Sequence, residues 1–260
     1  MCIIFFAYEC HPNYRLILAS NRDEYYKRPT EPAKFWDSHP WVFAGRDLDM
    51  MGTWLGITKS GRFAALTNYR DPSLQMENAK SRGVLVGDFL CSDQSPETYL
   101  MEVAKKRERY NPFNLLVGDL EQLCYFNKLT AEILPLEPGI YGLSNHSLDT
   151  PWPKVQKSKQ ALADYLENNP QVDPERIFEL LADAKPAQDQ YLPSTGISKE
   201  LEGLLSPVFI QGMDNYGTRA STVLLIDRHN HVFFQEKSFV PGQEQITEVV
   251  ERFGLVFNSN

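Results

Sequence analysis

A cysteine directly follows the initiator methionine in the opening stretch MCIIFFAYEC. If Met1 is removed, as commonly happens when a small residue follows it, Cys2 carries a thiol and a free α-amine on one residue. The reference pKa of an α-amine is about 7.7–8.0, so a sizeable fraction is neutral near pH 7 and can accept a proton from a nearby thiol. Cys2 would then be a nucleophile with its own general base. The alternative interpretation is a small apolar side chain that only fills the core.

Attack of a thiolate on an acyl carbon also needs hydrogen-bond donors for the oxyanion and groups that orient the nucleophile. Four polar clusters stand where strand-like apolar runs begin or end. They are ASNRDEYY with Asn21, Arg22, Asp23 and Glu24; LTNYRDP with Asn68, Tyr69 and Arg70; GLSNH with Asn145; and YGTRASTVLLID with Arg219. The ends of neighbouring strands can hold such side chains in one cleft, although the same residue types are also common turn formers.

The sequence predicts no metal site and no required cofactor. His229 and His231 stand in DRHNHV, which is typical of a hairpin turn and lacks a clustered carboxylate or thiolate. The four cysteines are irregularly spaced without a C-x-x-C pair, which argues against both a zinc site and a disulfide framework. No strand, GxGxxG loop and helix follow one another, so a phosphate cradle of that kind is not expected.

Composition narrows the class of partner. The 260 residues carry a formal net charge of −8, which disfavours nucleic acid because phosphate binding needs clustered Lys and Arg. No apolar run approaches the roughly 18 to 20 residues that a bilayer span needs, and the first residues lack the basic start of a secretory signal. We therefore expect a cytoplasmic protein without an integral membrane segment.

The polar clusters need strands to position them. Residues 2–8 and 15–20 are short apolar runs around a turn-like stretch, which predicts a β-hairpin, and residues 53–69 repeat the pattern. Further strands are expected at 114–119, 124–127, 140–145, 207–212, 221–227 and 232–239.

Helical patterns lie between these strands. Residues 95–110 begin with Ser95 as an N-cap and Pro96 at the first helical position, and residues 173–183 begin with Asp173 in the same way. A third helix is expected over residues 154–168. Strands in runs and helices in groups favour an α+β fold with a largely antiparallel sheet, built as one domain over residues 1–260. Residues 185–206 are expected to form a long surface excursion.

Several blocks of the sequence also resemble those of a known protein family. The stretch SNRDE, together with MCIIFFAY, GTWLGIT, LTNYRDP, SRGVLVGDFL, NPFNLLVGD, YGLSNHSLDTPWPKV and YGTRASTVLLID, resembles the NRDE family, also called the transport and Golgi organisation 2 family. The blocks occur in the family's order and cover nearly the whole chain. The family is in turn similar to N-terminal nucleophile hydrolases of the choloylglycine hydrolase and penicillin V acylase branch. That resemblance implies an αββα four-layer sandwich.

The resemblance also implies roles for individual residues. Cys2 matches the nucleophile of the hydrolase branch, Asn68 and Asn145 match its two asparagines, and Arg219 matches its late arginine. The branch separates its early Arg and Asp by two residues, whereas Arg22 and Asp23 are adjacent here. The register could instead pair Asn21 with Glu24, and we favour Arg22 with Asp23. The remaining cluster residues are expected to bind substrate, namely Asn21, Glu24, Tyr69 and Arg70.

Two functions follow from this likeness. The first is an amidohydrolase that attacks a linear C–N or related acyl bond of a small molecule through Cys2. The second is a carrier that keeps the scaffold without the chemistry and binds haem, acyl-CoA or another lipid, as has been proposed for members of the family.

Overall fold

The computed structural model describes residues 2–240 and 246–256. The chain divides into two compact units, the first formed by Met1–Lys27 with Glu137–Phe253 and the second by Arg28–Leu136 with Gly254–Asn260. Each unit contains an antiparallel sheet and helices, which confirms the predicted α+β fold. The expectation of one domain over residues 1–260 stays a prediction.

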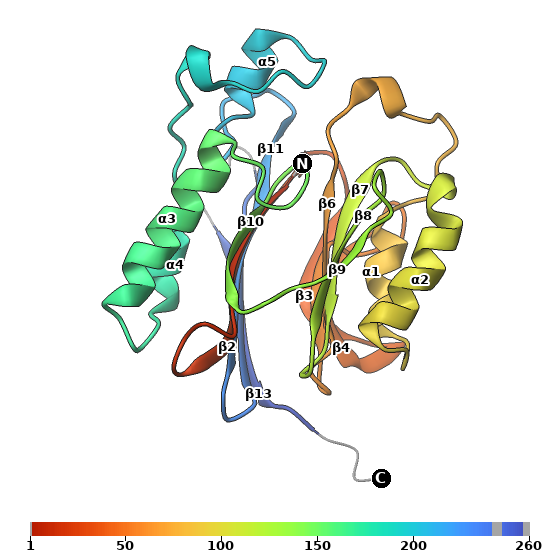
Figure 1. Cartoon of the computed structure of the whole chain (residues 1–260), viewed down its shortest axis with the longest axis vertical. Helices are drawn as coiled ribbons and strands as arrows, with labels where there is room; N and C mark the ends of the chain where they lie inside the picture. The colour runs from red at the N-terminus through yellow and green to blue at the C-terminus, as the bar shows by residue number, and fades with distance from the viewer. Residues whose placement is uncertain (1, 241–245, 257–260) are drawn as a thin grey trace. The chain divides into compact units, whose positions relative to one another are not determined.

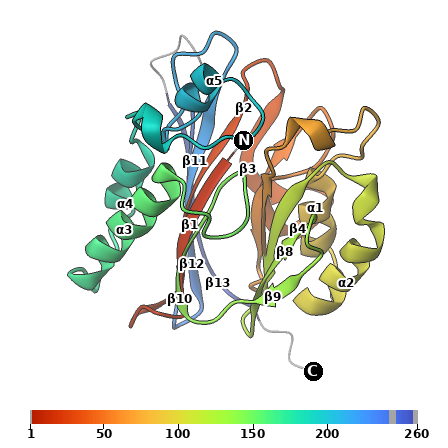
Figure 2. The ribbon, with the colours of Figure 1, turned by 45° about the horizontal axis from the view of Figure 1, so that its top comes forward.

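The sheet of the first unit has the strand order β10-β1-β2-β11-β12-β13 among the described residues. Strand β2 pairs with β1 on one side and with β11 on the other, so the start of the chain and a late strand share one sheet (Figures 1 and 2). The strands are β1 (Cys2–Tyr8), β2 (Tyr14–Tyr25), β10 (Gly139–Leu143), β11 (Tyr216–Asp227), β12 (His231–Ser238) and β13 (Thr247–Gly254). The β1–β2 pair confirms the predicted hairpin at the start of the chain.

Two helices, α3 (Pro153–Glu167) and α4 (Pro174–Leu181), cover one face of this sheet (Figure 1). Because side chains alternate along a strand, every second residue of β1 faces the helices. Ile3 and Phe5 lie in that core with Ile177 of α4. Cys2 has the opposite parity and therefore belongs to the face away from α3 and α4.

The second unit has its own sheet, in the order β3-β4-β5-β6-β7-β8-β9. Its helices are α1 (Gly83–Leu90) and α2 (Pro96–Lys106), and its strands are β3 (Thr30–Trp36), β4 (His39–Asp47), β5 (Leu55–Thr58), β6 (Phe63–Asn68), β7 (Phe113–Gly118), β8 (Leu123–Asn127) and β9 (Ile133–Pro135). Phe89 of α1 and Leu100 of α2 share a core with Leu115 and Phe126 of the sheet.

Local capping explains where two helices begin. The Ser95 side chain accepts a hydrogen bond from the Thr98 N–H, and the Asp173 side chain accepts one from the Glu175 N–H. Both predicted caps are confirmed. The excursion at residues 185–206 contains the 3-10 turn Asp189–Tyr191 and α5 (Lys199–Leu204); two further 3-10 turns span Pro72–Leu74 and Arg107–Arg109.

The predicted strand at residues 207–212 is wrong, because this segment has no strand conformation. Its apolar residues are buried as a strand's would be, yet its backbone bonds partly to side chains and partly to single backbone groups of Asp183 and Thr218. The Asn21 amide donates to the Val208 carbonyl at 2.9 Å, and the Ile210 N–H donates to Thr218 Oγ1 at 2.8 Å. The segment therefore packs on the sheet without pairing along its length.

Candidate active site

Cys2 stands at the first position of β1, directly opposite Arg22 of β2. Its side chain is half-buried, and the backbone of Asp23 hydrogen-bonds to its sulfur. Burial raises the pKa of the Cys2 thiol; the negative charge of Asp23 raises it further, while this backbone hydrogen bond and the positive charge of Arg22 act in the opposite direction. The thiol therefore has charged groups of both signs within electrostatic reach.

Asn145 follows the end of β10 by two residues, at the edge of the strand that pairs with β1. Ile4 of β1 pairs with Leu143 of β10, and the same antiparallel register continued for two residues past the end of β10 would bring Asn145 opposite Cys2. The Ser144 hydroxyl supports the placement, because it donates to the Cys2 carbonyl at 3.1 Å and lies 3.4 Å from Asn145 Oδ1. Asn145 is fully buried. A buried amide next to a thiol can donate to an oxyanion that develops there.

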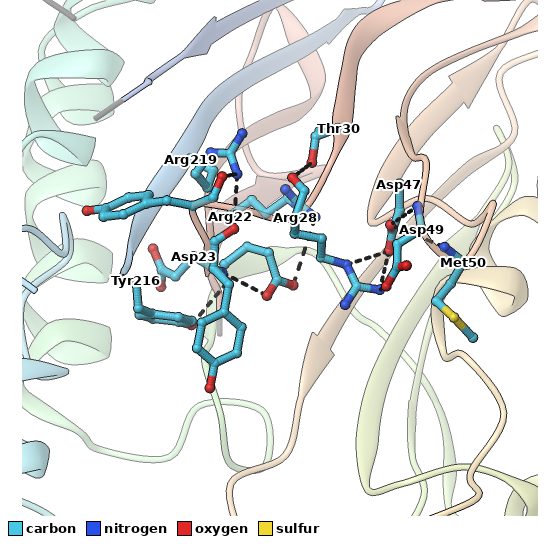
Figure 3. A network of polar contacts seen from close by, with 12 residues as sticks. Arg22, Asp23, Arg28, Thr30, Asp47, Asp49, Met50, Tyr216 and Arg219 are labelled. Carbon is cyan, nitrogen blue, oxygen red and sulfur yellow. Dashed lines mark hydrogen bonds and ion pairs between the residues drawn. The ribbon is translucent and has the colours of Figure 1, made fainter. Parts of the chain in front are cut away.

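Asp23 is buried and held by β11 (Figure 3). Its Oδ1 accepts a 2.7 Å hydrogen bond from the Thr218 hydroxyl, and its main-chain carbonyl accepts one from the Tyr216 hydroxyl at 3.0 Å. The carboxylate is thus fixed on the strand next to the one that carries it. A fixed carboxylate can orient a neighbouring ammonium group.

Arg22 and Glu24 lie on the same face of β2, since they are two residues apart. The Arg22 guanidinium is nearly buried and lies 3.9 Å from the Glu24 carboxylate. Cys2 pairs with Arg22, so all three residues share one face of the sheet. The site residues on this face therefore include both a cation and an anion.

Arg219 occupies a β-bulge. The register between β2 and β11 shifts between Thr218 and Ala220, which leaves Arg219 as the extra residue. Its guanidinium donates to the carbonyls of Tyr25 and Tyr26 at 3.0 and 2.9 Å, which fixes the end of β2 (Figure 3). Burial lowers the pKa of Arg219, and the nearby charge of Arg22 lowers it further.

Asn21 faces the helices, with the parity of Ile3 rather than that of Cys2. Its amide nitrogen donates to the Leu181 and Val208 carbonyls, both at 2.9 Å, and its oxygen accepts a 2.6 Å hydrogen bond from Ser221. These bonds occupy the side chain within the protein. The structure thus places Asn21 away from the face that carries Cys2 and Arg22.

Three of the predicted residues belong to the second unit. Asn68 ends β6, and Tyr69 and Arg70 follow it, with the Tyr69 N–H donating to the Pro112 carbonyl at 3.0 Å. All three are half-buried. Their roles stay predictions.

A charged turn of the second unit also appears in Figure 3. Arg28 donates to Asp47 Oδ2 from two nitrogens, at 2.9 and 2.7 Å, and lies 3.6 Å from Asp49. Asp47 Oδ1 accepts from the backbone N–H groups of Asp49 and Met50. This arrangement closes the turn after β4.

Sequence reasoning missed the residues that hold the candidates in place. Ser144 stands directly before Asn145, and Thr218 directly before Arg219, so both were adjacent to residues already selected. Hydroxyl residues next to the candidates were the available signal. Among the described residues, no group of three or more His, Cys, Asp or Glu is arranged to bind a metal ion. None of the helices in the described part of the chain is long and apolar enough to cross a membrane.

The fold and the cysteine at the start of β1 define a class. A C2A mutant of the conjugated bile acid hydrolase from Clostridium perfringens aligns with 100% of this chain and 99% of its own, at a TM-score of 0.53 and 8% identity. The chain accordingly has the N-terminal nucleophile hydrolase fold, as the sequence resemblance implied.

The chain belongs to the transport and Golgi organisation 2 family, because the model of that family matches residues 1–241. The Transport and Golgi organization protein 2 homolog of Bos taurus is 39% identical over 259 residues, covering 92% of this chain and 94% of that protein. Transport and Golgi organization protein 2 of Drosophila melanogaster is 28% identical over 262 residues, covering 92% of each. The predicted family is confirmed.

Proposed function

We propose that this protein is an N-terminal cysteine hydrolase that cleaves a linear amide or related acyl bond of a small molecule. One observation carries the proposal. The sulfur of Cys2 is hydrogen-bonded by the backbone of Asp23, Arg22 is its direct strand partner, and the buried Asn145 follows the end of β10, the other strand that pairs with β1. Removal of Met1 would add an α-amine to the residue that already carries the thiol.

The reaction has two stages. The α-amine takes the thiol proton, the sulfur forms a bond to the carbonyl carbon, and the resulting oxyanion accepts hydrogen bonds from donors that include the Asn145 amide. The C–N bond then breaks, and the leaving amine takes the proton from the α-ammonium. Water attacks the thioester, releases the carboxylic acid and restores the thiol.

The charged neighbours have distinct roles in this proposal. Asp23, fixed by Thr218, would attract the α-ammonium because its charge already acts on the thiol of the same residue, and Arg22 favours the thiolate by its positive charge. Arg219 acts through the backbone, because it holds the end of β2 by two carbonyls. The 3.9 Å contact of the Arg22 guanidinium is with Glu24, so the pairing of Arg22 with Asp23 stays a prediction.

The test compares Cys2→Ala with Cys10→Ala, which removes an exposed thiol from the loop of the same hairpin. Purified wild type and both variants are incubated with a panel of N-acyl amino acids of increasing acyl length, and the released amine is quantified. Intact-mass measurement establishes whether Met1 is absent. We expect turnover by wild type and Cys10→Ala, and loss of at least about a hundredfold in Cys2→Ala.

Two results would overturn the proposal. One is an intact mass that retains Met1 in protein that is still active, since the α-amine would then be in a peptide bond. The other is hemin or acyl-CoA binding that is unchanged in Cys2→Ala, with no amide turned over by wild type, which would make the protein a carrier.

A further inference from the structure

Tyr26 follows β2 by one residue, and its phenol is held over β11. A Cβ atom built on Gly217 would lie 2.2 Å from the Tyr26 hydroxyl oxygen. Any side chain at this position would displace the Tyr26 hydroxyl, and its Cβ would also lie 2.8 Å from the Ile210 carbonyl oxygen. Gly217 therefore leaves open the space that the Tyr26 hydroxyl occupies.

That place is on the same face of the sheet as Cys2. Gly217 pairs with Glu24, and Glu24 shares its face with Arg22 through their 3.9 Å contact. Arg22 in turn pairs with Cys2. Paired residues of antiparallel strands point to one side, so the Tyr26 hydroxyl lies on the side that carries the thiol.

The surroundings make this hydroxyl a hydrogen-bond donor for a ligand. Burial and the charge of Asp23 raise the pKa of Tyr26, while the charge of Arg219 partly offsets them, so the phenol keeps its proton at neutral pH. The phenol is half-buried, and its oxygen bonds to no residue within 2–240 or 246–256. The Tyr26 backbone, in contrast, is fixed by Asn215 and Arg219.

We propose that the Tyr26 hydroxyl binds an oxygen acceptor of the substrate, a carboxylate or an amide carbonyl, remote from the bond that Cys2 attacks. The inference rests on the proposed function for the position of the reacting carbonyl. A rigid backbone, a space kept open by glycine and a protonated phenol together form a fixed donor. Such a donor selects substrates by their length and by the group at their far end.

The strand register determines how far the acceptor of the substrate must lie from its scissile carbonyl. Glu24 is two residues beyond Arg22, and Gly217 and Cys2 lie one strand away from β2 on either side of it. With about 3.4 Å per residue and about 4.8 Å between strands, Gly217 lies about 12 Å from Cys2. A substrate whose acceptor is about this far from the scissile carbonyl can engage both residues.

Alkylation of Cys2 measures this contact without requiring turnover. The probes are 6-(iodoacetamido)hexanoic acid, which has a carboxylate at the required reach, its neutral primary amide, and iodoacetamide as the short reference. Rate constants at Cys2 are determined by peptide mass spectrometry, which separates this thiol from the other cysteines. The readout is the rate with each long probe divided by the rate with iodoacetamide.

The variants isolate one oxygen atom. Tyr26→Phe removes the hydroxyl, and Gly217→Ala pushes it from its place. Tyr25→Phe is the matched control, because Tyr25 is 58% exposed and its ring makes an edge-to-face contact with Tyr216. We expect Tyr26→Phe to lower the ratio about tenfold for the carboxylate probe and about threefold for the amide, as the loss of a charged and a neutral hydrogen bond predicts. Tyr25→Phe should leave both ratios unchanged.

The double variant gives the decisive comparison. If Gly217→Ala acts through the hydroxyl, adding it to Tyr26→Phe changes the ratio no further. Equal ratios in wild type and Tyr26→Phe would overturn the inference, as would a further loss in the double variant. Failure of the proposed function would instead appear as absent amide turnover by wild type, while Tyr26→Phe still lowers the probe ratios. The two failures are therefore distinguishable.

Discussion

At the scale of single residues, the thiol of Cys2 is the group whose protonation the surroundings control. Burial raises its pKa and the carboxylate of Asp23 raises it further, since a nearby negative charge opposes a thiolate. In Asp23→Asn the charge disappears, while the backbone contact to the sulfur is kept. We therefore expect the midpoint of the pH–rate profile for iodoacetamide alkylation of Cys2 to move to lower pH in this variant.

The measurement is made on chain with and without Met1, so that the α-amine is a separate variable. Asp227→Asn serves as the control, because Asp227 lies at the opposite end of β11 from Thr218. A midpoint that stays fixed in Asp23→Asn would show that this carboxylate does not act on the sulfur.

The sequence could predict which residues are candidates but not which of them meet. The sequence NRDE does not show which side of the sheet each residue faces. Asn21 faces α4 and Arg22 faces Cys2, because successive side chains of a strand point to opposite faces of the sheet. Asn145 comes to the Cys2 end of the sheet because β10 pairs with β1, which joins positions about 140 residues apart. No local pattern encodes such a register, so composition and spacing could not derive the roles that the sequence resemblance implied for these residues.

At the scale of elements, Asn21 joins three of them. Its fully buried side-chain amide, on β2, hydrogen-bonds to Leu181 at the end of α4, to Val208 in the segment after α5 and to Ser221 of β11. Asn21→Ala would leave two carbonyls and one hydroxyl without this partner. We expect the free energy of unfolding to fall by about 2–4 kcal/mol, because unsatisfied buried polar groups cost about 1–3 kcal/mol each and relaxation recovers part of the loss.

Urea unfolding monitored by circular dichroism provides the measurement. Asn13→Ala is the matched control, since it also removes an asparagine amide that donates to a carbonyl, at an exposed position. The control should change stability by less than about 0.5 kcal/mol. Equal losses in the two variants would mean that the joined elements do not depend on Asn21.

Local signals determined which elements were predictable. Helices α2 and α4 have caps at their first residues, and the sequence located both. Helix α1 contains Gly83 and Gly87, which disfavour a helix, so it has no clear sequence signal. Gly83 is explained by packing, because a Cβ there would lie 3.0 Å from the Thr53 carbonyl oxygen. Strand β4 carries Pro40, which weakens a strand signal, and it was likewise missed.

At the scale of the whole molecule, several carboxylates are held ionised by the fold. The pKa of Glu175 is lowered by its hydrogen bond from Lys237. Burial alone would raise the pKa values of Asp47 and Asp227, but the hydrogen bonds that each accepts outweigh it and lower both. These groups lie in both units of the chain.

Because of these lowered pKa values, the free energy of unfolding depends on pH in the acidic range. A carboxyl group whose pKa is lower in the folded than in the unfolded chain contributes stability above its unfolded value, about 4, and loses it as the pH falls through the folded value. We therefore expect the contribution of these carboxylates to the free energy of unfolding to be nearly constant from pH 7 to 5 and to decrease below about pH 4. Urea unfolding at a series of pH values measures this curve.

Asp47→Asn tests the origin of the decrease at one defined contact. At pH 7 the variant loses the charge-assisted bonds from Arg28, with an expected cost of about 1–2 kcal/mol, while the amide oxygen can still accept backbone hydrogen bonds. As the pH falls through the lowered pKa of wild-type Asp47, this carboxylate becomes protonated, so the two curves should converge. Asp37→Asn is the control, because the Asp37 side chain is 96% exposed. Parallel curves for wild type and Asp47→Asn would show that this turn does not contribute to acid unfolding, and the lowered pKa of Asp47 would have no energetic consequence for the chain.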